Sequence, residues 1–65
     1  MEEFRSIQEK FVNILLASGF SEQEALRVSS TFFFSWFKSQ TEEHKTPQAY
    51  ETSVKEFLVR LKQNH

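Results

Sequence analysis

Apolar residues recur at helical spacing in three segments of the chain, with polar residues between them. In the first segment Phe4, Ile7, Phe11 and Ile14 follow alternating steps of three and four residues, and Leu15 lies beside them. Steps of this size place side chains on one face of an α-helix. The pattern therefore predicts a helix over residues 2–18.

The boundary between the first two segments carries a stop signal followed by a start signal. Gly19 can adopt the left-handed conformation that ends a helix, and Phe20 follows where the accompanying hydrophobic contact is expected. The segment from Ser21 to Glu24 has the spacing of a capping box. In this motif the side chains of the first and the fourth residue each accept a hydrogen bond from the backbone amide of the other. These signals predict a short turn and a new helix over residues 21–39.

The second segment has the widest apolar arc, roughly 180° on a helical wheel. It contains Ala25, Leu26, Val28, Phe32, Phe33, Trp36 and Phe37. An arc this wide can face two neighbours, so we expect this helix to lie between the other two. Ser29 and Ser30 are small enough to admit a close neighbour, with their hydroxyls bonded to carbonyls one turn earlier.

The third segment starts after a polar stretch. Residues 40–45 predict a loop, with the option of a short helical turn begun by Thr41. Thr46 followed by Pro47 is a typical helix start. The helix predicted over residues 47–62 has a narrower apolar stripe, formed by Tyr50, Val54, Phe57, Leu58 and Leu61. The whole pattern predicts an all-α fold, a small antiparallel three-helix bundle forming one domain over residues 1–65.

Composition limits how such a bundle is stabilised. A chain of 65 residues buries a small share of its surface, and this one has no cysteine to form a disulfide. Dense packing and oligomerisation remain, and an aromatic content of 15% suits both. The net charge of −1 and the short apolar stretches predict a cytoplasmic protein without a membrane segment.

Catalytic and metal chemistry finds little support in the sequence. The only histidines, His44 and His65, lie in the predicted loop and at the terminus, far from each other in sequence. One glycine cannot form a phosphate-binding loop, and there is neither Cys nor Asp to complete a metal site. We therefore expect no enzyme activity, metal, cofactor or small-molecule substrate.

The run of aromatic residues in the second helix is the most unusual feature. Phe34 falls about 60° beyond the edge of the apolar arc and is expected at the surface. Val59 points almost opposite Tyr50 on the third helix and is also expected to be exposed. The hypothesis is a protein–protein interaction module, a homodimeric regulator or inhibitor. Its predicted partner-binding residues are Phe34, Phe37, Trp36 and Val59.

Nucleic-acid binding is the alternative hypothesis. Lys55, Arg60 and Lys62 are the basic residues of the third helix, and lysine and arginine side chains contact phosphates. Glutamates in the same part of the chain, such as Glu51 and Glu56, balance their charge. The interaction module is therefore the preferred hypothesis.

Two short stretches resemble known families. Ala17-Ser18-Gly19-Phe20 is similar to the Met-Gly-Phe turn of ubiquitin-associated domains, without the methionine. The segment from Lys45 to Tyr50, continued by Phe57-Leu58, resembles the first helix of the core-binding domain of tyrosine recombinases. The first resemblance implies a three-helix bundle that binds ubiquitin, and the second a DNA-associated helix. Neither match extends far enough to assign the chain to a family.

Overall fold

A computed structural model describes residues 2–63 of the chain. Three α-helices and one 3₁₀ turn follow one another: α1 (Glu2–Ala17), α2 (Glu22–Ser39), η1 (Glu42–His44) and α3 (Pro47–Gln63). The described residues contain no strand. The predicted all-α fold is confirmed, and each predicted helix boundary lies within one residue of the observed one.

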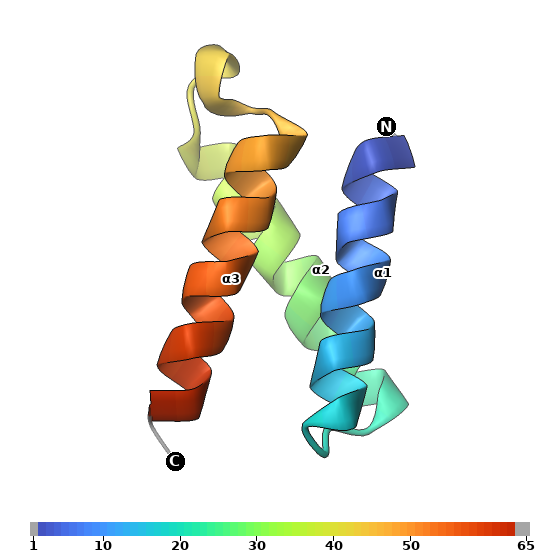
Figure 1. Ribbon diagram of the computed structural model, residues 1–65. Coiled ribbons are helices and arrows are strands. Elements are labelled where there is room, and N and C mark those ends of the chain that lie inside the picture. The colour runs from blue at the N-terminus through green and yellow to red at the C-terminus, as the bar shows by residue number, and fades with distance from the viewer. Residues whose placement is uncertain (1, 64–65) are drawn as a thin grey trace.

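The helices form a flat, three-helix arrangement (Figure 1). α1 and α3 run side by side in the same direction, whereas α2 runs the opposite way and crosses behind them. The molecule measures 34 × 24 × 16 Å. Packed helix axes lie about 8–10 Å apart, so the thinnest dimension holds two layers, α1 and α3 in one and α2 in the other.

The end of α1 is a Schellman motif. The Phe20 amide donates to the Leu15 carbonyl at 3.1 Å, and the Gly19 amide donates to the Leu16 carbonyl at 3.1 Å. Gly19 has a φ of 101°, which a residue with a Cβ adopts only under strain. The predicted glycine cap is confirmed.

The start of α2 is the predicted capping box. The Glu24 amide donates to the Ser21 hydroxyl at 3.2 Å, and the Ser21 amide donates to Glu24 Oε1 at 3.0 Å. The hydrogen bond from the Ser21 backbone amide, followed by the Ser21 side chain, lowers the pKa of the Glu24 carboxyl. Together the two caps fix the tight turn from α1 to α2.

The connection from α2 to α3 includes the helical turn considered at Thr41. The His44 amide donates to the Thr41 carbonyl at 2.9 Å, and the Thr41 hydroxyl lies 2.8 Å from His44 Nδ1. At the start of α3 the Ala49 amide donates to the Thr46 hydroxyl at 3.2 Å. Thr46 is therefore the N-cap that the sequence predicts.

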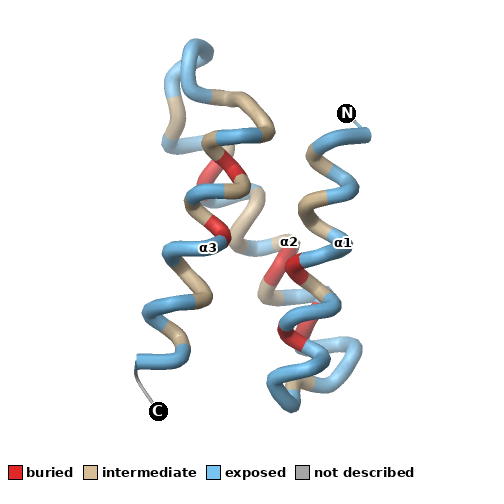
Figure 2. Tube along the Cα trace, viewed as in Figure 1, coloured by how far each residue is buried: buried red, intermediate tan, exposed pale blue. Residues whose placement is uncertain are grey.

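The core is aromatic and runs diagonally through the molecule. Buried positions occupy the C-terminal half of α1 and the N-terminal half of α3 (Figure 2). The fully or almost fully buried hydrophobic residues are Phe11, Leu15, Ala25, Trp36, Tyr50 and Val54. Tyr50 is surrounded by rings, with centroids 5.1 Å away for Phe33, 5.2 Å for Trp36 and 5.9 Å for Phe4.

The wide apolar arc of the second helix faces both other helices, as expected, since its rings contact Phe4 of α1 and Tyr50 of α3, but its backbone does not lie between theirs. α1 is the helix whose backbone closely approaches both others. α2 and α3 meet mainly through large rings, such as Phe32 and Phe57 with centroids 5.1 Å apart, which hold the two backbones apart. Ser29 is fully buried and its hydroxyl donates to the Leu26 carbonyl at 3.1 Å, which is the predicted hydrogen bond to a carbonyl one turn earlier.

Two residues assigned to apolar stripes are exposed instead. Ile14 is 42% exposed and Leu26 is 49% exposed. Ile14 lies near the end of α1, where α1 and α3 spread apart (Figure 1). Leu26 lies at the edge of the α1–α2 contact, in a shallow hollow beside Val12 and Asn13. The packed surface is narrower than the apolar arc on both helices.

Candidate protein interface

Phe34 is the most exposed large hydrophobic residue in the described part of the chain. Its side chain is 64% exposed, as the sequence predicts. Its aromatic neighbour is Phe33, with ring centroids 6.1 Å apart. The residues one turn away on the same side of α2, Thr31 and Lys38, are exposed as well. A phenyl ring in such a polar setting has one side open to a partner.

The other two predicted anchors of α2 are occupied within the fold. Trp36 is 7% exposed and belongs to the core. Phe37 is half-buried, with its ring 5.4 Å from that of Phe33 and the ammonium group of Lys45 lying 4.5 Å above it. Trp36 and Phe37 are thus packed within the fold, whereas the ring of Phe34 faces outward.

Val59, the fourth predicted anchor, lies on another element and in polar surroundings. It is 54% exposed on α3, in a shallow depression that also contains Lys55, Glu56 and Arg60. Single exposed valines are common on protein surfaces. Phe34 does not line the depression that contains Val59.

The structure has a groove between α2 and α3 that the sequence did not predict. We call it the α2–α3 groove; its main part, about 420 Å³, is lined by Arg27, Val28, Thr31, Phe32, Ser35 and Phe57. It continues into a hollow of about 280 Å³ that shares Phe32, Ser35 and Phe57 and reaches Arg60. The sequence assigns Phe32 and Phe57 to the apolar stripes, and both are partly buried against the core. Because their rings separate the two backbones, however, the outer sides of these rings form the floor of a groove.

Phe34 does not line this groove, but on a helical wheel it lies close to Arg27, which does. At 3.6 residues per turn, Phe34 and Arg27 are about 20° apart around α2, and the groove side of the helix begins at Arg27. We call the exposed residues of this side the outer stripe of α2: Glu24, Arg27, Thr31, Phe34, Ser35 and Lys38. A protruding phenyl ring and an apolar groove are thus adjacent on one surface.

The molecule exposes more surface than a compact chain of its mass. Its accessible surface is 5053 Å² for 7.7 kDa. A typical folded monomer of that mass exposes about 4300 Å². The difference, about 700 Å², is close to the roughly 800 Å² that each partner buries in an interface of standard size.

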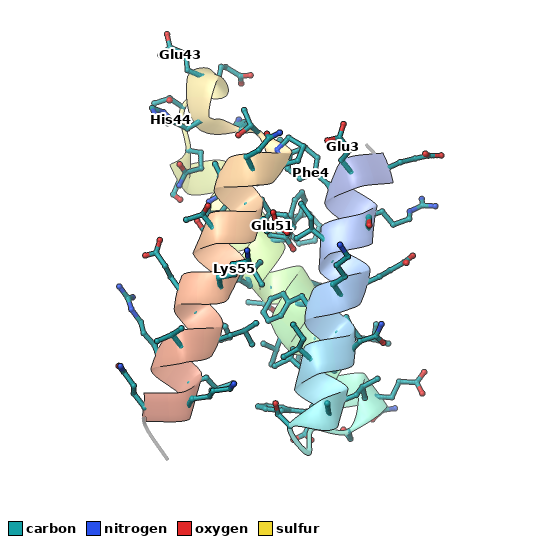
Figure 3. All side chains as sticks on the ribbon, viewed as in Figure 1. Glu3, Phe4, Glu43, His44, Glu51 and Lys55 are labelled. Carbon is teal, nitrogen blue, oxygen red and sulfur yellow. The ribbon has the colours of Figure 1, made fainter. Side chains whose placement is uncertain are left out.

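The basic residues predicted for nucleic-acid binding lie among carboxylates on α3, and two of them, Lys55 and Arg60, line one depression. Lys55 and Arg60 are about 140° apart around α3, and Glu56 lies with them in the same depression. Lys62 is exposed but does not line that depression. Figure 3 shows Lys55 beside Glu51 on the side of α3 that faces the viewer. Carboxylates lie between the cations on this helix. Their negative charge opposes the binding of a polyanion such as a nucleic acid.

Other chemistry-bearing groups lie apart from one another. Figure 3 shows His44 and Glu43 at the tip of the loop, away from the helices. Among residues 2–63 no three His or Glu side chains come together as metal ligands, and His65 lies outside the described residues. None of the described helices is long and apolar enough to cross a membrane.

Comparisons with known proteins identify no relative of this chain. No family model matches the chain, and no curated protein or solved structure shows significant similarity to it. The two short resemblances noted in the sequence receive no support from these comparisons.

Proposed function

We propose that this protein is a non-enzymatic interaction module that works as a homodimer, assembled through the outer stripe of α2 with Phe34 as its anchor. The observation that carries the proposal is the 64% exposure of Phe34 on a molecule with surplus surface. Partly exposed aromatic residues that become fully buried on association supply a large share of binding free energy.

The composition of the outer stripe supports a protein partner. Aromatic residues and arginine are enriched at protein interfaces, and the stripe has one of each at its centre, Phe34 and Arg27. Thr31 and Ser35 are small and allow another helix to approach. A second copy of the chain is the partner we favour, because the surplus surface matches the share that one subunit contributes to a standard dimer.

Regulation or inhibition of a larger protein is the role we infer for the dimer. A rigid module without catalytic groups acts by covering part of its target. We place this activity in the cytoplasm.

The test is the mass of the protein in solution. Sedimentation equilibrium at micromolar concentration is expected to give a dimer for the wild type. Phe34→Glu places a charge at the anchor and is expected to weaken dimerisation by at least about 30-fold, the equivalent of 2 kcal/mol for an interface hot spot.

Val59→Glu is the matched control, because it places the same charge at an exposed apolar residue outside the stripe. It is expected to leave the dimer intact, and circular dichroism checks that both variants remain folded. A monomeric wild type, or equal effects of the two variants, contradicts the proposal.

A further inference from the structure

We propose, on the basis of the homodimer proposed above, that each Phe34 ring packs on the guanidinium group of the partner's Arg27. The two α2 helices then run antiparallel about a two-fold axis at Thr31, and the α2–α3 groove takes no part in the contact. Two cation–π contacts, related by the axis, hold the dimer together.

The outer stripe of α2 is open to a second helix. α2 forms a layer of its own, with α1 and α3 together on its other side (Figure 1). Thr31, at the middle of the stripe, lies about 160° around α2 from the fully buried Ser29. The stripe therefore points away from the core, and a partner helix can lie along it without disturbing the packing of the subunit.

Two-fold symmetry decides which residues meet across such a pair. An antiparallel pair about an axis at Thr31 joins like sides of the two helices. Phe34 and Arg27 lie about 60° and 40° to one side of Thr31. Val28 and Phe32, which line the α2–α3 groove, lie to the other side.

The heights along the helix agree with this pairing. Phe34 follows Thr31 by three residues, and Arg27 precedes it by four. In the antiparallel pair Phe34 and the partner's Arg27 therefore differ in height by one residue, about 1.5 Å. The small Thr31 side chain on the axis allows the helix axes to approach to about 8–10 Å. Each phenyl ring thus lies within reach of a guanidinium group.

Arginine and a phenyl ring form a favourable pair at an interface. The guanidinium group is planar and weakly hydrated, and it stacks on aromatic faces. Among residues 2–63, Arg27 forms no salt bridge and no cation lies over the Phe34 ring. Both side chains are exposed in the single chain. Association removes them from water together, and the attraction between cation and ring is stronger there.

The charges at the ends of the stripe favour the antiparallel direction. Glu24 and Lys38 lie seven residues before and after Thr31, and both are exposed. An antiparallel pair places each Glu24 opposite the partner's Lys38. A parallel two-fold pair would turn Phe34 toward the partner's groove, but it also places the two Glu24 carboxylates together and the two Lys38 ammonium groups together. Opposite charges therefore select the arrangement in which Phe34 meets Arg27.

Cysteines at the ends of the stripe distinguish the two directions, because the chain has no cysteine of its own. Glu24→Cys and Lys38→Cys are prepared separately, one with a tag that changes its mass, and mixed before mild oxidation. The antiparallel pair predicts that the mixed disulfide forms at least about tenfold faster than a disulfide between like chains. A parallel pair predicts the reverse. Each variant loses an exposed ion pair, which contributes little, so the dimer is expected to persist.

A double-mutant cycle tests the contact itself. Arg27→Gln is expected to weaken dimerisation by at least about fivefold, since two cation–π contacts are lost per dimer. Arg60→Gln, at an exposed position of α3, is the matched control and is expected to leave dimerisation unchanged. Phe34→Leu keeps an apolar side chain but removes the ring. In that background Arg27→Gln is expected to weaken dimerisation by less than about twofold.

The outcomes separate this arrangement from the proposed function. Mixed disulfides, together with an Arg27→Gln effect that depends on the Phe34 ring, support the arrangement. The arrangement is wrong, and the proposed function stands, if Phe34→Glu dissociates the dimer but like chains cross-link faster. The same holds if Arg27→Gln acts no differently from Arg60→Gln, or weakens the Phe34→Leu dimer as much as the wild type. Species larger than a dimer also overturn the arrangement, since they indicate an open chain of contacts. A monomeric wild type removes both.

Discussion

The ammonium group of Lys45 lies 4.5 Å from the centre of the Phe37 ring, and 3.2 Å from Glu42 Oε1. One side chain thus connects the η1 loop to the aromatic cluster of α2. A cation above the face of a ring is attracted by the electrons of that face. This contact shields Phe37 from solvent and makes it part of the fold, whereas Phe34 remains open.

We expect Lys45→Gln to lower the free energy of unfolding by about 0.5–1 kcal/mol, because it removes the cation over the ring. The ion pair with Glu42 adds little, since the Glu42 side chain is 92% exposed. Urea denaturation measures the effect, and Lys55→Gln is the control for losing one positive charge. Equal changes in both variants would show that Lys45 acts through net charge alone.

Tyr50→Phe is expected to stabilise the protein by about 1 kcal/mol. Tyr50 is fully buried, and its hydroxyl has no hydrogen-bond partner among residues 2–63. A buried hydroxyl without a partner loses its hydration on folding and gains nothing in exchange. The measurement is the midpoint of thermal unfolding. A lower midpoint for Tyr50→Phe contradicts the prediction, because it indicates a partner for the hydroxyl.

The same tyrosine predicts a loss of stability at alkaline pH. Burial raises the pKa of Tyr50 from 10.0 to about 12. Above pH 10.0 the unfolded chain releases the phenolic proton while the folded chain retains it, so rising pH favours unfolding. The free energy of unfolding should fall by up to about 3 kcal/mol as pH rises through this interval.

Tyr50→Phe isolates the contribution of the tyrosine to this loss of stability. The variant lacks the only tyrosine of the chain, so its stability should fall less steeply. Tyrosinate absorbance of the folded wild type gives the pKa directly. A transition near pH 10.0 would contradict the burial of the hydroxyl.

Local signals in the sequence predicted the elements well, and long-range packing was harder to predict. The caps at Gly19, Ser21 and Thr46 depend on neighbouring residues, so their residue types suffice to predict them. The exposure of Phe34 follows from helical periodicity alone. The α2–α3 groove depends instead on how far the Phe32 and Phe57 rings separate two helices, which no single segment specifies.

Gly19→Ala is expected to lower the free energy of unfolding by about 1–2 kcal/mol. The φ of 101° is unfavourable for a residue with a Cβ, although an added Cβ meets nothing within 4 Å. The cost is therefore backbone strain without a steric clash. Gly19→Asn is the control, because asparagine tolerates the left-handed conformation better than alanine does. Chemical denaturation should rank the wild type first, Asn second and Ala third.

Ser29 tests the close contact between α1 and α2. It is fully buried, and its hydroxyl donates to the Leu26 carbonyl within its own helix. Ser29→Ala keeps the small volume and leaves no donor without a partner, so its effect on the free energy of unfolding should stay below about 0.5 kcal/mol.

Ser29→Leu forces extra volume into the packed contact, and we expect a loss of about 1–3 kcal/mol. Ser35→Leu introduces the same side chain at an exposed position of α2 and controls for the change in helix propensity. Urea denaturation, carried out below the concentration at which the chains associate, compares the three variants. If Ser29→Leu is as stable as Ser35→Leu, then α1 and α2 do not pack closely at this residue.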